Sequence, residues 1–138
     1  MADPVRIQLR RTKGFGLQEH SRALNGLEAL KVDRSTIWGN PFPIIKGTST
    51  SAGKTSDVWQ VGTWDGPAMW FCDTKDEATD LAIKAFRSWI DGGARAALRA
   101  KARVELRGKN LACWCMPGPC HADVLLEIAN RPICEEVA

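Results

Sequence analysis

Apolar and polar positions alternate near the start of the chain in a way that predicts a short strand. Val5 to Arg10 has the two-residue period of a half-buried strand. Residues 11–26 are rich in glycine and polar side chains, and they predict a loop with a helical turn near Leu24. Further strands are expected at 30–32 and in a hairpin of residues 58–64 and 68–72 around the turn at 65–67.

The clearest helix begins after Thr74. Thr74 and Glu77 have the spacing of a capping box, and Gly92 with Gly93 ends the helix. The apolar residues between them recur at helical spacing: Ala78, Leu81, Ala82, Ala85, Phe86, Trp89 and Ile90. The remaining expected elements are a basic helix at 94–101, a short connection at 104–106, a strand at 111–115 and a helix at 120–129.

Two polar stretches are expected to lack regular structure. Residues 34–43 predict an ordered loop, because Gly39 and two prolines interrupt both helical and strand periodicity. Residues 47–56 are small and polar, and predict a flexible surface loop.

This order of elements predicts an α/β or α+β fold. A chain of 138 residues with 44% apolar and 25% charged residues has ordinary globular proportions, so we expect one compact domain over residues 1–138. A small sheet packs with two to three helices, and a strand, a turn and a helix follow one another near the C-terminus.

The composition favours a reduced, cytoplasmic setting. The first residues lack the apolar core of a signal peptide, and no apolar run is long enough to span a membrane. Five cysteines are an odd number, which favours thiols that bind metal or take part in catalysis over disulfides. The net charge of +3 is too small to diagnose nucleic-acid binding.

The densest group of reactive side chains lies around the expected strand–turn–helix. Cys113 and Cys115 share one face of the strand, while Trp114 points to the other. Cys120 and His121 stand at the helix start, where unpaired backbone N–H groups and the helix dipole favour a thiolate. The turn between strand and helix allows three thiols and an imidazole to converge.

Three interpretations of this group stay open. Cys113, Cys115, Cys120 and His121 can be metal ligands, for zinc or less readily for an iron–sulfur cluster, although C-x-C-x4-C-H is not the common zinc-knuckle spacing. In a metal-free catalytic site Cys120 is the nucleophile, with His121 or Asp123 as base or orienting group. The third interpretation is buried structural cysteines, with Asp123 as a helix-start charge.

The loop at 34–43 carries a second candidate group. Arg34, Ser35 and Asn40 can bind a phosphate or a ribose, and Trp38 or Trp114 can stack on a base. The alternative is a turn that satisfies its own polar groups, with Trp38 in the core. The basic segment 95–109 is either a solvated face or an attractor of phosphate-bearing ligands.

Residues 32–42 and 106–125 resemble the domain-of-unknown-function family 4326 of phages and prokaryotes. The family pattern is similar to Trp38-Gly39-Asn40-Pro41-Phe42, Cys113-Trp114-Cys115 and Pro119-Cys120-His121-Ala122-Asp123 here, with Ala122 where glycine is frequent. The resemblance implies a phage-type setting, hence host cytoplasm, and supports the two candidate groups. It implies no reaction.

The leading hypothesis is a pocket enzyme, a hydrolase or transferase, that acts on a nucleotide, nucleobase or nucleic-acid-derived ligand. The loop at 34–42 would face the Cys113–Asp123 segment across a cleft. The alternative is a zinc-stabilised module that binds nucleic acid or a protein without catalysis. An inhibitor that acts through its surface alone is a third class, which no sequence feature favours.

Overall fold

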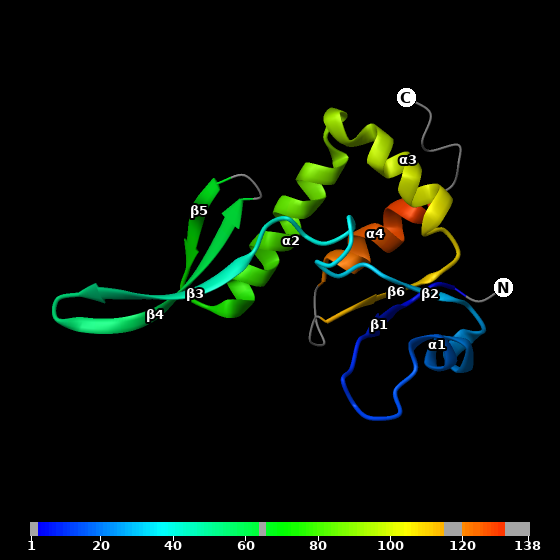
Figure 1. Cartoon of the computed structure of the whole chain (residues 1–138). Coiled ribbons are helices and arrows are strands. Elements are labelled where there is room, and N and C mark those ends of the chain that lie inside the picture. Colours follow the sequence, from blue (N-terminus) through cyan, green and yellow to red (C-terminus); the bar gives the residue numbers. More distant parts are fainter. Residues whose placement is uncertain (1–2, 64–65, 115–119, 132–138) are drawn as a thin grey trace.

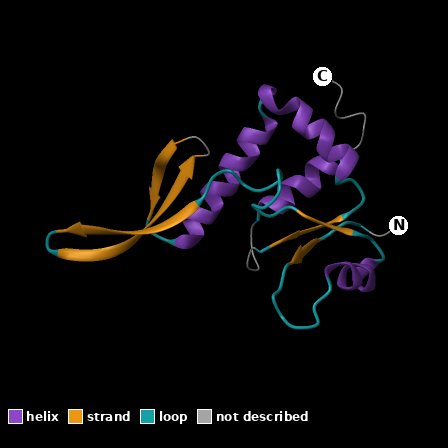
Figure 2. Cartoon of the chain, in the orientation of Figure 1, coloured by secondary structure: helices purple, strands orange, loops and turns teal. Residues whose placement is uncertain are grey.

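The computed structural model describes residues 3–63, 66–114 and 120–131, in which two small sheets and four α-helices form an α+β domain (Figures 1 and 2). This confirms the expected fold class. In chain order the elements are β1 (Arg6–Gln8), α1 (Leu17–Asn25), β2 (Ala29–Lys31), β3 (Ile44–Ser51), β4 (Lys54–Thr63), β5 (Gly66–Cys72), α2 (Lys75–Asp91), a 3-10 turn (Gly93–Arg95), α3 (Ala96–Glu105), β6 (Asn110–Cys113) and α4 (His121–Ala129). None of the described helices combines the length and the apolar character needed to span a membrane.

The first sheet is parallel, with β6 between β1 and β2. All four residues of β6 are buried, because helices cover both faces of the sheet. Ala112 packs in a small cluster that includes Leu17 of α1, whereas Leu111 and Cys113 belong to the main core with α4. In Figure 1, α1 and α4 lie on opposite sides of this sheet. Cys113 therefore points toward α4.

A buried polar network joins α1 to the amino end of β6. Asn110 is fully buried, and its Oδ1 accepts a hydrogen bond of 2.9 Å from the Val5 amide. Its Nδ2 donates to Ser21 Oγ at 2.7 Å and to Asn25 Oδ1 at 2.8 Å. Since a buried amide is costly unless its groups are paired, this network fixes the register of α1 against the sheet.

Helix α2 forms as the capping box predicts. The Thr74 side chain accepts a 3.1 Å hydrogen bond from the Glu77 amide, and Ala78, Ala82, Phe86 and Ile90 are the buried residues of the helix. At its far end Arg99 Nη1 donates to the carbonyls of Ile90 and Gly92, both at 2.8 Å. One arginine of the basic segment 95–109 thus caps a helix.

The flexible loop expected at residues 47–56 is instead a β-hairpin. Strand β3 pairs with β4 in antiparallel register from Ile44↔Val61 to Ser51↔Lys54, and β4 pairs with β5. Ala52 (φ 53°) and Gly53 (φ 78°) make the tight turn. Both faces of the outer hairpin are exposed, so the sequence lacks the apolar alternation by which strands are usually recognised. The hairpin projects from the body (Figure 1).

Two other expectations are corrected. Residues 11–26 contain α1, a full helix of nine residues rather than one turn, which ends at Gly26 in the left-handed conformation with φ 80°. Ser21 is the buried residue of this helix, so the apolar stripe of α1 is too narrow for the sequence pattern to predict a full helix. Residues Val104 and Glu105 belong to α3 rather than to a connection.

The loop between β2 and β3 closes tightly on itself at Gly39. A Cβ atom on Gly39 would lie 2.6 Å from the Cα of Arg34 and 2.9 Å from the carbonyl oxygen of Asp33. Both neighbours are backbone atoms, so they cannot move aside as a flexible side chain would. Glycine at this position therefore permits the loop geometry that places Asp33 and Arg34.

Replacing Gly39 with alanine is expected to lower the free energy of unfolding by about 1–3 kcal/mol, the usual range for overpacking. Chemical denaturation followed by circular dichroism measures the change. Gly93→Ala is the matched control, because a Cβ atom at Gly93 meets no atom within 4 Å. Equal stability of the two variants would contradict the tight closure.

Candidate functional site

A pocket of about 290 Å³ opens at the carboxyl end of β6. Its walls are the loop after β2, one side of α2, and the junction between β6 and α4. Side chains at the carboxyl ends of parallel strands commonly line ligand sites, because the loops that follow the strands converge there. Besides Thr79 and His121, the polar and aromatic lining residues are Asp33, Arg34, Ser35, Asn40, Phe42 and Trp114.

Two thiols form part of the pocket wall. Cys113 ends β6 and Cys120 is the N-cap of α4, and their Sγ atoms lie 3.0 Å apart. Their side chains are 1% and 2% exposed, so they reach the exterior mainly through the pocket. The Ala122 amide donates to Cys120 Sγ at 3.5 Å, a capping bond that directs the start of the helix dipole at this sulfur.

His121 is held with one defined nitrogen toward Cys120. Its Nε2 lies 2.7 Å from the carbonyl oxygen of Val32, and a carbonyl can only accept, so Nε2 carries the hydrogen. Nδ1 of the same ring lies 3.6 Å from Cys120 Sγ, and when the ring is neutral this nitrogen carries the lone pair. Phe86 contacts the ring edge-on, with centroids 5.5 Å apart. These contacts give a thiol beside a proton acceptor.

Arg6 approaches the sulfur pair from β1. Its Nη1 lies 3.4 Å from Oδ2 of Asp123. Burial lowers the pKa of Arg6, but the charges of Asp123 and Cys120, a hydrogen bond to Cys120 and the charge of Cys113 outweigh this effect and raise the pKa. Asp123, expected as base or orienting group, thus binds Arg6, and the Val32 carbonyl orients His121.

Asp33 organises the opposite rim of the pocket. Its two carboxylate oxygens accept from Ser35 Oγ at 2.5 Å and from Trp114 Nε1 at 2.9 Å. Burial raises the pKa of Asp33, but the hydrogen bonds from Ser35 and Trp114 and the charge of Lys31 outweigh it, so the net pKa is lowered. Arg11 lies over the Trp114 ring, 5.0 Å from its centroid.

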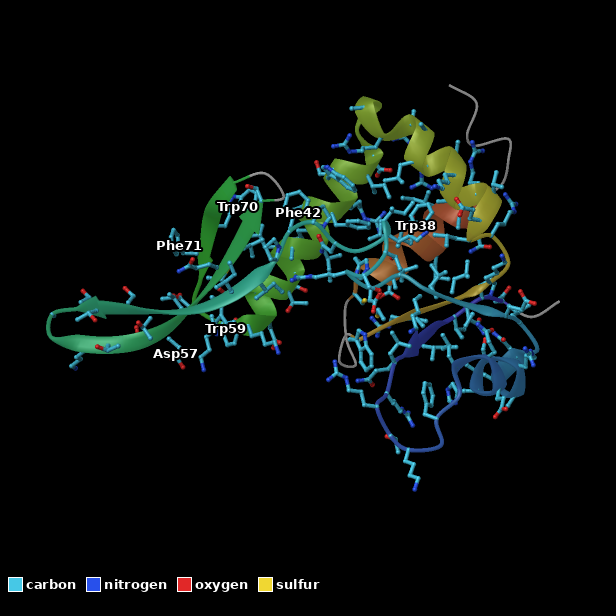
Figure 3. All side chains as sticks on the ribbon, viewed as in Figure 1. Trp38, Phe42, Asp57, Trp59, Trp70 and Phe71 are labelled. Carbon is cyan, nitrogen blue, oxygen red and sulfur yellow. The ribbon has the colours of Figure 1, made fainter. Side chains whose placement is uncertain are left out.

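The structure brings three of the four expected loop residues to the pocket. Arg34, Ser35 and Asn40 line it. Asn40 also ties the loop to α2, since its Nδ2 donates to the Ala82 carbonyl at 3.2 Å and its Oδ1 accepts from the Phe42 amide at 2.9 Å. Trp38 is 6% exposed and belongs to the core, within the body of the molecule (Figure 3). Phe42 supplies an aromatic surface to the pocket instead.

The structure describes three of the four expected metal ligands. Cys113, Cys120 and His121 are adjacent, while Cys115 lies outside the described residues. Among residues 3–63, 66–114 and 120–131 no group of three or more histidine, cysteine or acidic side chains is arranged to hold a metal ion. A zinc site would therefore need Cys115 or a rearrangement of the thiols.

Sequence reasoning missed Asp33, Arg6 and the Val32 carbonyl. Asp33 directly precedes the Arg34-Ser35 pair, so its position in the motif was a usable signal. The alternation of residues 5–10 also placed Arg6 on the face opposite Ile7. Nothing in the sequence indicated that this face would meet the start of α4, because that contact joins residues 117 positions apart.

The lowered pKa of Asp33 predicts a pH-dependent contribution to stability. A carboxylate whose pKa is depressed by folding stabilises the folded state above its unfolded pKa of about 3.9, and this contribution is lost as the pH falls through the lower folded value. Wild type is therefore expected to be more stable than Asp33→Asn at about pH 6, and the difference to vanish near about pH 2–3.

Thermal unfolding across this pH range measures the difference. Trp114→Phe keeps an aromatic ring but removes the indole donor. Asp33→Asn should therefore lower the stability of the Trp114→Phe protein by less than it lowers that of wild type. A stability difference that is constant with pH would contradict the assignment.

Comparison with known proteins places the chain in a family without a described activity. A 59-residue segment of the chain is 39% identical to the "Uncharacterized 12.4 kDa protein in nrdA-td intergenic region" of Enterobacteria phage T4. The segment covers 42% of this chain and 51% of the relative. No solved structure matches. The family model described as a domain of unknown function, DUF4326, matches residues 7–131, which include every residue that lines the pocket. The chain belongs to the DUF4326 family.

Proposed function

We propose that the pocket binds a nucleobase- or nucleotide-type ligand and that Cys120 is the nucleophile of a hydrolase or transferase acting on it. The observation that carries this proposal is the Nδ1 lone pair of His121 beside Cys120 Sγ at 3.6 Å, in a ring whose other nitrogen is held by Val32. A nucleophilic thiol needs a nearby base, and the base needs an orienting partner. Here a backbone carbonyl takes the orienting role often held by a carboxylate.

Two further contacts bring positive charge to Cys120. Arg6 supplies a positive charge and a hydrogen bond, and Asp123 holds Arg6 in position. The Ala122 amide and the start of α4 add their partial positive charge at the same sulfur. Positive charge and a helix start beside a thiol stabilise its thiolate, which is the reactive form. The reducing cytoplasm, where thiols persist, is the setting that this chemistry requires.

The ligand class follows from the size and lining of the pocket. A volume of about 290 Å³ is at the lower end for small-molecule sites and suits a single base. Trp114, which is 43% exposed, and Phe42 offer flat apolar surfaces, while Asp33 accepts hydrogen bonds from amino or imino groups. Arg34 and Asn40 also line an adjoining depression of about 280 Å³, with room for a sugar or phosphate.

In the proposed reaction the Cys120 thiolate attacks an electrophilic carbon of the ligand. A carbon–sulfur bond forms, and the leaving group departs with the proton that His121 took from the thiol. Water or a second acceptor then attacks the same carbon and returns the thiol. This sequence covers hydrolysis and group transfer, which differ only in the acceptor.

Protection from alkylation tests the proposal. Reduced protein is treated with iodoacetamide at neutral pH, with or without nucleobases and nucleoside monophosphates, and labelling of Cys120 and Cys72 is followed by mass spectrometry. At least one compound should slow labelling of Cys120 and leave Cys72 unchanged, since Cys72 on β5 does not line the pocket. Arg34→Ala should weaken protection by a phosphate-bearing compound ~10-fold or more, as expected for a charge-assisted hydrogen bond.

Arg22→Ala is the matched control for the charge change, because Arg22 is exposed on α1, beyond the opposite face of the sheet. His121→Ala should slow labelling of Cys120 without affecting Cys72. If no compound protects Cys120, or if Arg22→Ala and Arg34→Ala weaken protection equally, the ligand proposal is wrong.

A second candidate function is a zinc-stabilised module that binds nucleic acid or a protein. The adjacency of Cys113, Cys120 and His121 favours it, with Cys115 as the fourth ligand. Tetrahedral zinc with bonds of about 2.3 Å separates its sulfurs by about 3.8 Å, so the two described thiols would have to move apart from 3.0 Å. Stoichiometric zinc, with loss of folding in each Cys→Ser variant, would favour the module over the enzyme.

A further inference from the structure

The two sulfur atoms that line the pocket, of Cys113 and Cys120, lie close enough together for a reaction between them to be considered. The 3.0 Å between Cys113 Sγ and Cys120 Sγ is about 1 Å longer than a disulfide bond, which measures about 2.05 Å. We propose that Cys113 and Cys120 form a reversible dithiol–disulfide couple that exchanges with low-molecular-weight disulfides. The couple does not require the proposed nucleotide ligand or its reaction.

The backbone around the two thiols favours a bridge between them. Cys113 is held by the sheet, because Leu9 donates to its carbonyl at 2.8 Å. Cys120 is held at the start of α4 by the Ala122 amide and by the buried first turn of that helix. Two thiols fixed in this way lose little further freedom when they bond, which raises their effective concentration toward each other. Closing the remaining gap needs a shift of about 1 Å.

The surroundings distinguish the two sulfurs. Cys120 receives the Ala122 amide, lies 3.6 Å from His121 Nδ1 and is hydrogen-bonded by Arg6. Since the thiolate is the attacking species in disulfide exchange, Cys120 is the attacking residue and Cys113 the resolving residue. Both sulfurs line the pocket, which gives a small disulfide its route to them.

The exchange balances in two steps. The Cys120 thiolate attacks one sulfur of an oxidant RSSR, the oxidant's sulfur–sulfur bond breaks, and RS⁻ leaves and takes up a proton as RSH. Cys113, after losing its proton to His121 or solvent, attacks Cys120 Sγ in the mixed disulfide and releases the second RSH. Two protein thiols lose two electrons and two protons, and the oxidant becomes two thiols.

The couple would also regulate the proposed enzyme, and this consequence alone rests on the proposed function. A Cys113–Cys120 disulfide occupies the sulfur that acts as nucleophile, so the oxidised protein cannot attack a ligand. The reduced protein regains the nucleophile when a thiol reductant opens the bond.

Peptide mapping after equilibration with glutathione and glutathione disulfide tests the couple. Trypsin leaves residues 110–138 in one peptide, because it does not cleave between Arg131 and Pro132. Cleavage after Trp114 then separates Cys113 from Cys115, Cys120 and Cys134. The variant Cys72→Ser/Cys115→Ser/Cys134→Ser retains only the pair, so fragments that stay joined after cleavage identify the Cys113–Cys120 bond. We expect this bond in oxidising mixtures and its loss in dithiothreitol.

Matched variants test the two roles. When Cys113→Ser is added to the same background, the exchange should stop at the first step and a glutathione adduct on Cys120 should accumulate. When Cys120→Ser is added instead, Cys113 should stay mostly unmodified. Far-UV circular dichroism checks folding; if the triple variant does not fold, Cys115→Ser/Cys134→Ser is mapped by the same cleavage, because Cys72 lies on a different tryptic peptide. Absence of the joined fragments in every oxidising mixture would overturn the proposal, as would equal adduct formation on Cys113 and Cys120.

These outcomes are independent of ligand protection. Joined fragments without any protecting nucleotide would sustain the couple and remove the nucleotide function. Protection of Cys120 by a nucleotide in reduced protein, without any bond between Cys113 and Cys120, would sustain the nucleotide function and remove the couple.

Discussion

The parallel pairing of β6 with both β1 and β2 is the constraint on which the pocket depends. It places the carboxyl ends of three strands together and leaves both faces of β6 to be covered by helices. Cys113 at the end of β6, Arg6 from β1 and the Val32 carbonyl after β2 then surround the start of α4. Asn110 secures the other end of the same strand through its bonds to α1. A shift in this register would move Arg6 and the Val32 carbonyl away from Cys113 and the start of α4.

The chemistry of the site follows from burying polar groups beside one another. A buried thiol, a buried imidazole and a partly buried guanidinium are costly unless each has partners, and the Ala122 amide, the Val32 carbonyl and Asp123 supply them. The proposed nucleophile, the zinc alternative and the dithiol couple are three uses of this arrangement, and they differ in the distance that they require between sulfurs. At 3.0 Å the two sulfurs lie between these cases, about 1 Å farther apart than in a disulfide and about 0.8 Å closer than around a tetrahedral zinc ion.

Local signals in the sequence predicted the elements whose boundaries depend on neighbouring residues. The Thr74–Glu77 capping box and the apolar spacing behind it predicted α2, and the turn at 65–67 predicted the pairing of β4 with β5. The same reasoning failed where a segment buries little. The outer part of the β3–β4 hairpin is exposed on both faces, and α1 buries only a narrow stripe. Neither sequence therefore shows the apolar periodicity typical of a strand or a helix.

For the site, the residue pattern predicted that Cys113 would lie in a strand, that Cys120 and His121 would begin a helix, and that an Arg34–Asn40 loop would carry polar groups. That the strand ends at Cys113 is a finding of the structure. Strand alternation and helix capping are local, so they can be read from adjacent residues. Only the tertiary structure decided that Trp38 enters the core while Asp33 and Phe42 reach the pocket, and that Arg6 meets Asp123. These outcomes depend on which faces pack together over long separations in the chain, and packing of that kind leaves no periodic trace in the sequence.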